Sequence, residues 1–337
     1  MKTVVLGAGR MGRRHVQIVR EMGLRLVGVA DPKGEALAAA AEEFALAGQV
    51  LYTDARRLLH DHRPECVIVA TTAQDHCGLT CAAAEAGAKF ILCEKPMATS
   101  LEDCDRMITA CREAGARLTI NHQMRFMEQY TGPKALLETE AFGGLTSVTV
   151  VAGNFGLAMN GSHYFEMFRF MTDEPPATAQ AWFSSEKVSN PRGPQFEDRA
   201  GSVRLTTRSG KRFYMEIGAD QGHGMQAIYS GRYGQIIVNE LTGAMHMSHR
   251  REEHRSLPTT RYGMPAVEEN VRMTPADSLG PSRSVLEALV SGGQAPTPEE
   301  GRLAVAALVA CYVSDETGHS VVPVDDRLPS DRTFPWA

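Results

Sequence analysis

Short apolar runs alternate with amphipathic stretches over the first 120 residues of the chain. The runs lack a polar face, which is typical of parallel strands buried on both sides of a sheet. They cover residues 4–6, 26–30, 50–52, 66–70, 90–92 and 118–120. The helical stretches between them cover residues 11–22, 34–44, 55–60, 76–86 and 101–114. This alternation predicts an α/β domain at residues 1–120, a Rossmann-type doubly wound parallel sheet whose ligands bind at the carboxyl ends of the strands.

The ends of several predicted helices carry residues that favour a helix boundary. Asp54 and Ser100 precede two of the helical stretches, and their side chains can cap the first free N–H groups. Glycines 23, 87 and 115 follow three others, where helices commonly end.

After residue 120 the polar and apolar positions alternate with a period of two. A helical stretch at about residues 125–138 leads into predicted strands at 147–152, 178–184, 200–207, 212–217, 225–230 and 235–239. Two helices, near 282–291 and 298–316, follow, and the polar stretch 250–284 predicts a long loop. We therefore expect a second, α+β domain at residues 121–337, with a large open and mostly antiparallel sheet. The uncovered face of such a sheet predicts a homodimer or homotetramer.

A glycine-rich turn joins the first predicted strand to the first predicted helix. Its sequence is Gly7-Ala8-Gly9-Arg10-Met11-Gly12, and the second apolar run ends at Asp31. In a dinucleotide-binding site, Gly7 allows the tight turn, Gly9 lets pyrophosphate approach the backbone, and Gly12 lets the helix pack on its strand. The N–H groups at the start of the helix then bind phosphate oxygens. A carboxylate at Asp31 accepts hydrogen bonds from ribose hydroxyls and repels a 2′-phosphate, so NAD is expected rather than NADP, although Lys33 weakens that preference.

Composition narrows the classes of partner and compartment. The net charge is −5, and no basic stripe or aromatic RNA-binding pattern appears, so nucleic acid is not expected. No signal-peptide order and no apolar run of about 18 residues appear, so no membrane partner is expected. The seven cysteines form no CxxC pair, which predicts reduced packing residues in a cytoplasmic protein.

The predicted strand at 90–92 leads directly into Cys93-Glu94-Lys95-Pro96. This places Lys95 at the ligand-binding edge of the sheet, and Pro96 fixes the chain after it, for example through a cis bond. Beside a nicotinamide, the lysine can hydrogen-bond a substrate oxygen and stabilise developing alkoxide charge. The alternative is a surface lysine at a strand end, but the direction of the strand favours the functional role.

These motifs together resemble the Gfo/Idh/MocA family, which includes glucose–fructose oxidoreductase and inositol dehydrogenase. The resemblance rests on the glycine turn running into Arg13-Arg14-His15, on the stretch from Ala70 to His76, and on Glu94-Lys95-Pro96. It implies that Lys95 is catalytic. With the glycine turn, we expect the cofactor to meet Thr71, Thr72, His76, Glu94 and Lys95. For His76, a capping role and a nicotinamide contact are both open, and His15 either packs near the glycine turn or is structural.

Family dehydrogenases carry an Asp-x-x-x-His motif on a helix of the second domain. His163 matches the histidine, which implies a general base, and Gly161 matches the preceding glycine. Met159 stands where the family has the aspartate, and Asn160 is the nearest polar residue. Asparagine cannot accept a proton, so a relay through a carboxylate is in doubt, although Asn160 can hydrogen-bond a substrate oxygen. Lys95 alone is the alternative acid and base.

Further candidates follow the sixth predicted strand. Arg125, with Asn121 and His122, is expected to bind substrate, and an ion pair at the domain interface is an equal alternative for Arg125. Asn154 and Tyr130 are weaker candidates for the same pocket. The histidines between residues 245 and 254 match no metal-ligand spacing, so no metal is expected and a solvated strand end or loop is predicted there.

Three functions fit these residues. The first is an NAD-dependent dehydrogenase that oxidises or reduces a secondary alcohol or ketone of a sugar, cyclitol or related polyol, with Lys95 and His163 handling the hydroxyl proton. The second is a glycoside hydrolase that uses tightly held NAD in a transient oxidation. The third is a non-catalytic dinucleotide sensor, against which the complete Glu94-Lys95-Pro96 and His163 set argues.

Overall fold

The computed structural model describes residues 1–153, 155–186, 189–258 and 264–336. The chain forms two compact units. Unit 1 comprises residues 1–123, 278–305 and 329–337, and unit 2 comprises residues 124–277 and 306–328. The chain thus first leaves unit 1 three residues beyond the boundary predicted from the sequence, and later segments return to it.

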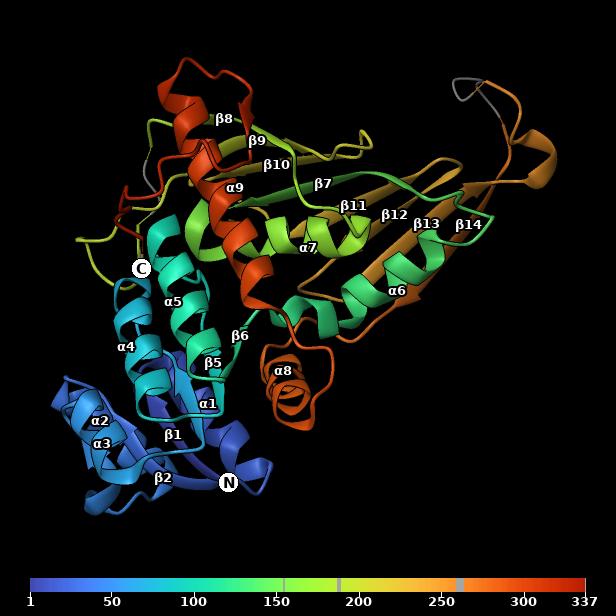
Figure 1. Cartoon of the computed structure of the whole chain (residues 1–337). Coiled ribbons are helices and arrows are strands. Elements are labelled where there is room, and N and C mark those ends of the chain that lie inside the picture. Colours follow the sequence, from blue (N-terminus) through green and yellow to red (C-terminus); the bar gives the residue numbers. More distant parts are fainter. Residues whose placement is uncertain (154, 187–188, 259–263, 337) are drawn as a thin grey trace. The chain divides into compact units, whose positions relative to one another are not determined.

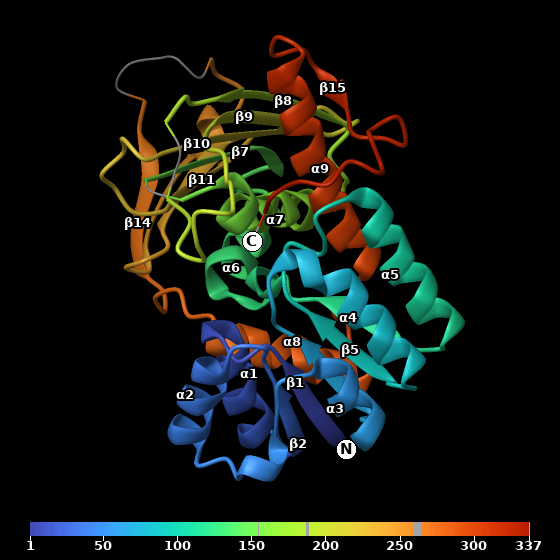
Figure 2. The ribbon, with the colours of Figure 1, turned by 90° about the vertical axis from the view of Figure 1, so that its left-hand side faces the viewer.

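Unit 1 contains a parallel sheet of six strands in the order β3-β2-β1-β4-β5-β6 (Figure 1). The strands are β1 (Lys2–Leu6), β2 (Arg25–Ala30), β3 (Leu51–Tyr52), β4 (Cys66–Val69), β5 (Phe90–Cys93) and β6 (Arg117–Ile120). The helices are α1 (Arg10–Glu21), α2 (Gly34–Phe44), α3 (Ala55–His62), α4 (Ala73–Glu85), α5 (Leu101–Glu113) and α8 (Leu279–Ser291). Helices α1, α2 and α8 lie on one face of the sheet and α3, α4 and α5 on the other (Figure 2). The predicted doubly wound sheet is confirmed.

Local interactions fix the ends of the helices in unit 1. The carboxylate of Asp54 accepts the N–H groups of Arg56 and Arg57, at 2.8 and 3.2 Å. The hydroxyl of Ser100 accepts the N–H of Asp103 at 3.1 Å. Both predicted caps are therefore confirmed. Such a cap contributes about 1 kcal/mol to helix stability.

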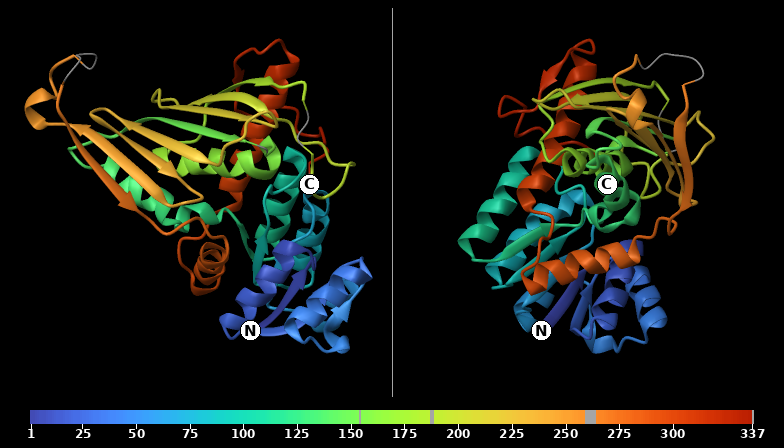
Figure 3. Two further views of the ribbon diagram at one scale, coloured as in Figure 1. Left: turned by 180° about the vertical axis from the view of Figure 1, so that it is seen from behind. Right: turned by 90° about the vertical axis from the view of Figure 1, so that its right-hand side faces the viewer.

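Unit 2 contains a mixed sheet of nine strands in the order β14-β13-β12-β11-β7-β10-β9-β8-β15 (Figure 3). The strands are β7 (Leu145–Gly153), β8 (Thr178–Phe183), β9 (Gly201–Thr206), β10 (Arg212–Gly218), β11 (Gln226–Gly231), β12 (Gly234–Asn239), β13 (Ala244–Arg250), β14 (Ala266–Arg272) and β15 (Val322–Pro323). Among the described residues of this sheet, β7 and β10 pair in parallel and the other strand pairs are antiparallel. The predicted open, mostly antiparallel sheet is confirmed.

Helices cover one face of this sheet. Helices α6 (Glu128–Leu137) and α7 (Ser162–Thr172) run along it (Figure 3). The end of α9 (Pro298–Glu316), a helix that begins in unit 1, reaches β8, where Ser314 Oγ accepts the N–H of Ala181 at 3.0 Å. Along β7, buried side chains such as Val148 and Val150 alternate with half-exposed ones such as Thr149. The period of two visible in the sequence therefore reflects one packed face and one open face.

The predicted loop at 250–284 is wrong in part. Residues Ala266–Arg272 form β14, which pairs antiparallel with β13 at the edge of the sheet. Most side chains of β14 are exposed on both faces, so the strand has no apolar alternation to reveal it. Helix α8 also begins at Leu279, before the loop was expected to end. The histidine-rich stretch from residue 245 lies largely in β13, a full strand rather than a strand end.

Packing accounts for most of the cysteines. Six of the seven are buried, and Cys81 is half-buried. In the part of the chain that the structure describes, no helix is long and apolar enough to cross a bilayer.

Candidate active site

The glycine turn is shaped by close packing at two of its three glycines. Gly7 has a φ of +101°, and a Cβ atom there would lie 2.5 Å from the carbonyl oxygen of Ala70. A Cβ on Gly12 would overlap the carbonyl oxygen of Gly7, so any side chain would push α1 away from β1. Gly9 is exposed, and a Cβ there would meet no atom of the described chain within 4 Å. Packing therefore explains Gly7 and Gly12, whereas Gly9 leaves backbone open to a ligand.

The start of α1 suits an anion. Gly9 occupies the N-cap position without a side-chain cap, and the first turn contains no acidic residue. Arg10 is exposed and Met11 half-exposed at this end of the helix. The free N–H groups and the helix dipole favour a pyrophosphate there.

Asp31 lies beside this turn. Its Oδ2 accepts the N–H of Ala8 at 2.8 Å, and its Oδ1 accepts the N–H of Lys33 at 2.8 Å. A carboxylate has about four lone-pair positions, so two remain for the hydroxyl groups of a ribose. The turn, the helix end and Asp31 thus fit a dinucleotide, with its pyrophosphate at α1 and its ribose at Asp31.

The end of β4 and the start of α4 bring three more predicted residues to the same edge of the sheet. Thr71 and Thr72 are half-exposed, and Thr72 is the N-cap residue of α4. His76 is buried, with Nε2 3.2 Å from the carbonyl oxygen of Thr71 and Nδ1 3.0 Å from that of Pro96. His76 therefore links the end of β4 to the residue that follows Lys95.

Lys95 follows β5 at the same edge. The side chain is half-exposed, and the Lys95–Pro96 bond is cis, as the sequence suggested. Glu94 is buried and faces His15 and Asn121. Asn121, predicted to bind substrate, is itself fully buried. Unit 1 thus brings Lys95 and the glycine turn to one edge of one sheet.

His163 lies in unit 2, near the start of α7. A π-helical turn at Leu157–Gly161 precedes α7 and contains Asn160, and the side chains of Asn160 and His163 are half-exposed. Such turns occur often at functional sites. Because His163 and Lys95 belong to different units, their meeting in one active site stays a prediction.

Asp198 holds this π-helical turn and was missed by the sequence analysis. Its buried carboxylate accepts the N–H groups of Ala158 and Met159 at 2.7 and 2.8 Å. A Cβ on Gly156 would collide with the same carboxylate. A carboxylate therefore contacts the backbone of Met159, although the side chain at this position is not the aspartate of the family motif.

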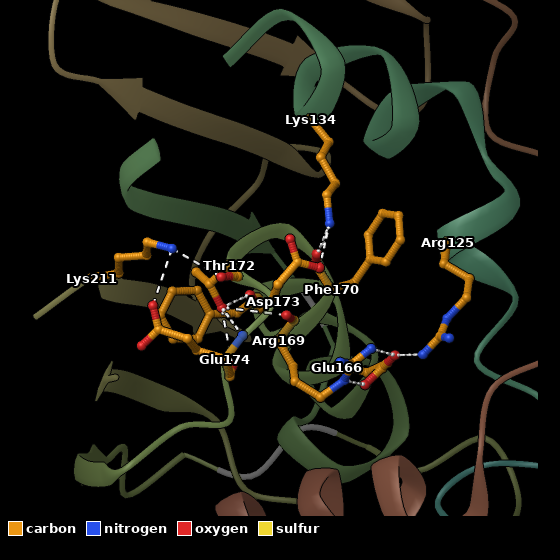
Figure 4. A network of polar contacts seen from close by, with 10 residues as sticks. Arg125, Lys134, Glu166, Arg169, Phe170, Thr172, Asp173, Glu174 and Lys211 are labelled. Atoms are coloured by element: carbon orange, nitrogen blue, oxygen red, sulfur yellow. Dashed lines mark hydrogen bonds and ion pairs between the residues drawn. The ribbon is translucent and has the colours of Figure 1, made fainter. Parts of the chain in front are cut away.

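Arg125 forms an ion pair within unit 2. Its guanidinium contacts the carboxylate of Glu166, which also receives two hydrogen bonds from Arg169, at 2.7 and 3.1 Å (Figure 4). Glu166 lies on α7, one turn after His163. The guanidinium of Arg125 also lies 5.8 Å from the centre of the Phe170 ring, which Lys134 approaches to 4.5 Å. These contacts tie Arg125 to the helix that bears His163.

Tyr130, a weaker candidate for the pocket, lies in the core of unit 2. Its hydroxyl donates to the carboxylate of Glu240 at 2.6 Å, and the hydroxyl of Tyr164 donates to the other oxygen at 2.9 Å. All three side chains are buried. Burial raises the pKa of Glu240, and the two hydroxyl donors only partly offset this. Asn154, the other weak candidate, lies outside the described residues.

The buried Glu240 predicts a pH-dependent stability. The native pKa lies above the unfolded value, so the group's contribution to stability is full below the unfolded pKa and is lost as the pH rises through the native pKa. We expect Glu240→Gln to remove that loss and to raise the free energy of unfolding by roughly 1 kcal/mol at alkaline pH. Urea unfolding at several pH values measures this. Glu138→Gln, at an exposed position, is the control, and a wild-type pH dependence in Glu240→Gln would contradict the expectation.

The histidines of β13 make other contacts. His246 Nδ1 lies 3.0 Å from the side-chain oxygen of Asn270, and His249 Nδ1 lies 3.1 Å from the carbonyl oxygen of Arg250. Among the described residues, no group of three potential ligands (His, Cys, Asp or Glu) is placed to hold a metal ion.

Residues 1–122 match the model of the family described as "Oxidoreductase family, NAD-binding Rossmann fold". This chain is an oxidoreductase whose residues 1–122 match the Gfo/Idh/MocA family. The family description also confirms NAD as the expected cofactor. The match covers the glycine turn, Asp31 and Lys95, and the relatives extend the similarity over the rest of the chain.

Two curated relatives and one solved structure illustrate the similarity. Inositol 2-dehydrogenase 2 of Saccharopolyspora erythraea is 27% identical over 96% of both chains. The 1,5-anhydro-D-fructose reductase of Ensifer adhaerens is 38% identical over 36% of both chains. The crystal structure of an oxidoreductase from Agrobacterium radiobacter with NAD+, L-tartaric acid and magnesium aligns with a TM-score of 0.80 at 18% identity, over 97% of this chain and 99% of that one. At that identity the structure supports the fold alone.

The carboxylate of Asp31 allows a direct test of cofactor preference in this oxidoreductase. We expect Asp31→Asn to strengthen NADP binding roughly tenfold, because the repulsion of the 2′-phosphate is lost while an acceptor for the N–H of Ala8 is kept. NAD binding should weaken, because a neutral amide binds ribose hydroxyls less strongly. Titration calorimetry with both cofactors measures the change. Glu42→Gln removes one exposed charge from α2 and should change neither affinity.

Proposed function

We propose that the protein is an NAD-dependent dehydrogenase acting on a secondary alcohol, or the corresponding ketone, of a sugar, cyclitol or related polyol. The observation that carries this proposal is the position of Lys95, which follows β5 at the sheet edge that also holds Gly9 and Asp31. A half-exposed lysine there can reach a substrate oxygen beside the cofactor. The names of the relatives, a cyclitol dehydrogenase and an anhydro-sugar reductase, support the substrate class.

The side chains of this chain would manage the substrate hydroxyl. Bound NAD supplies the acceptor or donor of hydride. Lys95 donates a hydrogen bond to the substrate oxygen and stabilises the negative charge that develops on it. His163 takes the hydroxyl proton as general base during oxidation and returns it during reduction. Asn160 and Arg125 lie on or against the same helical segment as His163 and would bind neighbouring substrate oxygens.

A panel of sugars, cyclitols and polyols tests the substrate class. We expect at least one member to raise the melting temperature only when NAD+ is present, because substrate binds the cofactor-loaded protein. The same compound should produce NADH, measured by its absorbance. A protein that cleaves glycosides with no net NADH would point instead to hydrolysis by transient oxidation. One that binds NAD and turns over no member of the panel would contradict the proposed substrate class.

We also propose that two or more copies associate through the open face of the nine-stranded sheet. The strand register places Tyr214 beside Thr149 and Ile228 on this face, away from α6 and α7. Trp182 of β8 lies on the same face, and 42% of its surface is exposed. Large apolar side chains on an open sheet favour a self-complementary contact. Light scattering of the purified protein gives the mass, and Tyr214→Glu should reduce it to that of one chain.

A further inference from the structure

A buried polar cluster joins four elements of unit 1 and includes Glu94, the residue that precedes Lys95. Nε2 of His15, on α1, lies 2.7 Å from Oε1 of Glu94, which follows β5. The amide of Asn121, which follows β6, donates to the same oxygen at 2.8 Å and to the hydroxyl of Ser282, on α8, at 3.1 Å. His15 and Asn121 are fully buried, and Glu94 is 4% exposed.

The cluster holds a buried negative charge. Burial would raise the pKa of the Glu94 carboxyl group, but the hydrogen bonds from His15 and Asn121 and the charge of Lys95 lower it to about 2. The carboxylate is therefore ionised at neutral pH. Lys95 is among the groups whose charges lower this pKa, so the carboxylate and the lysine ammonium attract each other.

A contribution to the stability of the fold does not by itself explain this cluster. Nδ1 of His15 and Oδ1 of Asn121 are buried without a hydrogen-bond partner among the described residues. Unpartnered buried polar atoms disfavour folding, and apolar replacements of a buried ion pair often fold as well or better. Such a cluster calls for an explanation other than stability, and it lies at the functional edge of the sheet.

The position of the cluster gives that explanation. His15 lies on α1, three residues after Gly12 of the glycine turn. The N–H of Glu94 donates to the carbonyl of Val69, and the N–H of Asn121 to that of Cys93, so the backbone before Lys95 is held by both neighbouring strands. The helix that would receive the pyrophosphate and the segment that bears Lys95 are thus joined through one carboxylate.

We propose that His15, Glu94 and Asn121 form a positioning unit for Lys95. The unit holds the carboxylate of Glu94 beside the lysine, and this charge keeps the lysine amine protonated so that it can donate a hydrogen bond to the substrate oxygen. This inference rests on the proposed function of Lys95. All three side chains are buried, so in this proposal they act through the lysine, which replaces the cofactor contact expected of Glu94 and the substrate contact expected of Asn121.

Acetylation of the protein by an amine-reactive ester tests the unit without any substrate. Only the unprotonated amine reacts, so removing the neighbouring charge in Glu94→Gln should raise the labelling rate of Lys95 at least threefold, as measured by peptide mass spectrometry. Lys2 and Lys89, in the same protein, serve as internal standards. The double variant His15→Leu/Glu94→Leu, which replaces the pair by apolar side chains, should show the same rise with a melting temperature at or above that of the wild type.

Thr119→Val is the matched control for loss of structure. Thr119 is buried on β6, two residues before Asn121, and its hydroxyl donates to the carbonyl of Pro296. This variant should lower the melting temperature and leave the labelling of Lys95 unchanged. Wild-type labelling of Lys95 in both cluster variants would overturn the proposal.

Measurements of kcat distinguish a failure of this inference from a failure of the proposed function on which it rests. With a substrate found in the panel, Glu94→Gln should lower kcat at least tenfold while KM and the Kd of NAD stay within about twofold. A kcat at the wild-type level would overturn the positioning role. If Lys95→Ala is inactive while the cluster variants label Lys95 at the wild-type rate, the positioning role is wrong and the proposed function stands. If Lys95→Ala stays active, the proposed function itself is wrong.

Discussion

Replacing Lys95 by alanine should lower kcat by about a thousandfold, because the variant loses both the hydrogen bond to the substrate oxygen and the positive charge beside it. Lys95 follows β5 at the edge of the sheet where Gly9 and Asp31 lie. The dinucleotide contacts expected at α1 and Asp31 do not involve the lysine side chain. The Kd of NAD should therefore stay within a few-fold of the wild-type value.

Two measurements check this result. Steady-state formation of NADH gives kcat, and titration calorimetry gives the Kd of NAD. Lys89→Ala removes an exposed lysine just before β5 and should leave both quantities unchanged. Wild-type turnover in Lys95→Ala would remove the lysine from the mechanism, and with it the proposed function.

The fold of unit 1 was predictable because its strands are buried on both faces. Each strand appears in the sequence as a short apolar run, and its observed bounds lie within two residues of the predicted ones. The capping residues Asp54 and Ser100 act over a few residues of chain, so their role could also be read locally. Local signals of this kind survive in a single sequence.

Strand β14 has no such local signal in the sequence. Most of its side chains are exposed, so neither burial nor alternation marks it, and it exists through its ladder with β13. In the sequence it is a polar segment without turn residues of its own. Pairing with a distant strand decides its structure, and that pairing is a property of the whole sheet.

The candidate site likewise contains features that the sequence reveals and features that only the structure reveals. The glycine turn and Glu94-Lys95-Pro96 are contiguous motifs, and they were found in the sequence. The contact of His15 with Glu94 spans 79 residues, and that of Ala158 with Asp198 spans 40. The sequence supplies the residue types of these pairs without their proximity, so the contact of Asp198 and the cluster of His15, Glu94 and Asn121 emerged only from the structure.

Replacing His163 by alanine should lower kcat by roughly a hundredfold or more, because the substrate hydroxyl loses its general base. In the wild type, protonation of the base slows oxidation at low pH, so the acid limb of the pH–rate profile should flatten in the variant. His223→Ala, at an exposed position in unit 2, is the control and should keep the wild-type profile. If His163→Ala keeps the wild-type kcat and the wild-type pH–rate profile, His163 is not the general base, and Lys95 is left as the acid and base of the proposed mechanism.

The double variant Lys95→Ala/His163→Ala shows whether the two side chains act on one proton. If they do, each single variant already disables the transfer, and the double variant should lose little more than the worse of the two. If each acts on a separate step, the two losses in kcat should multiply. Because Met159 stands in place of the aspartate of the family motif, no carboxylate at that position can orient His163. We expect the non-additive result, because the protonated Lys95 stabilises the alkoxide that forms when His163 removes the proton, so both side chains serve one step.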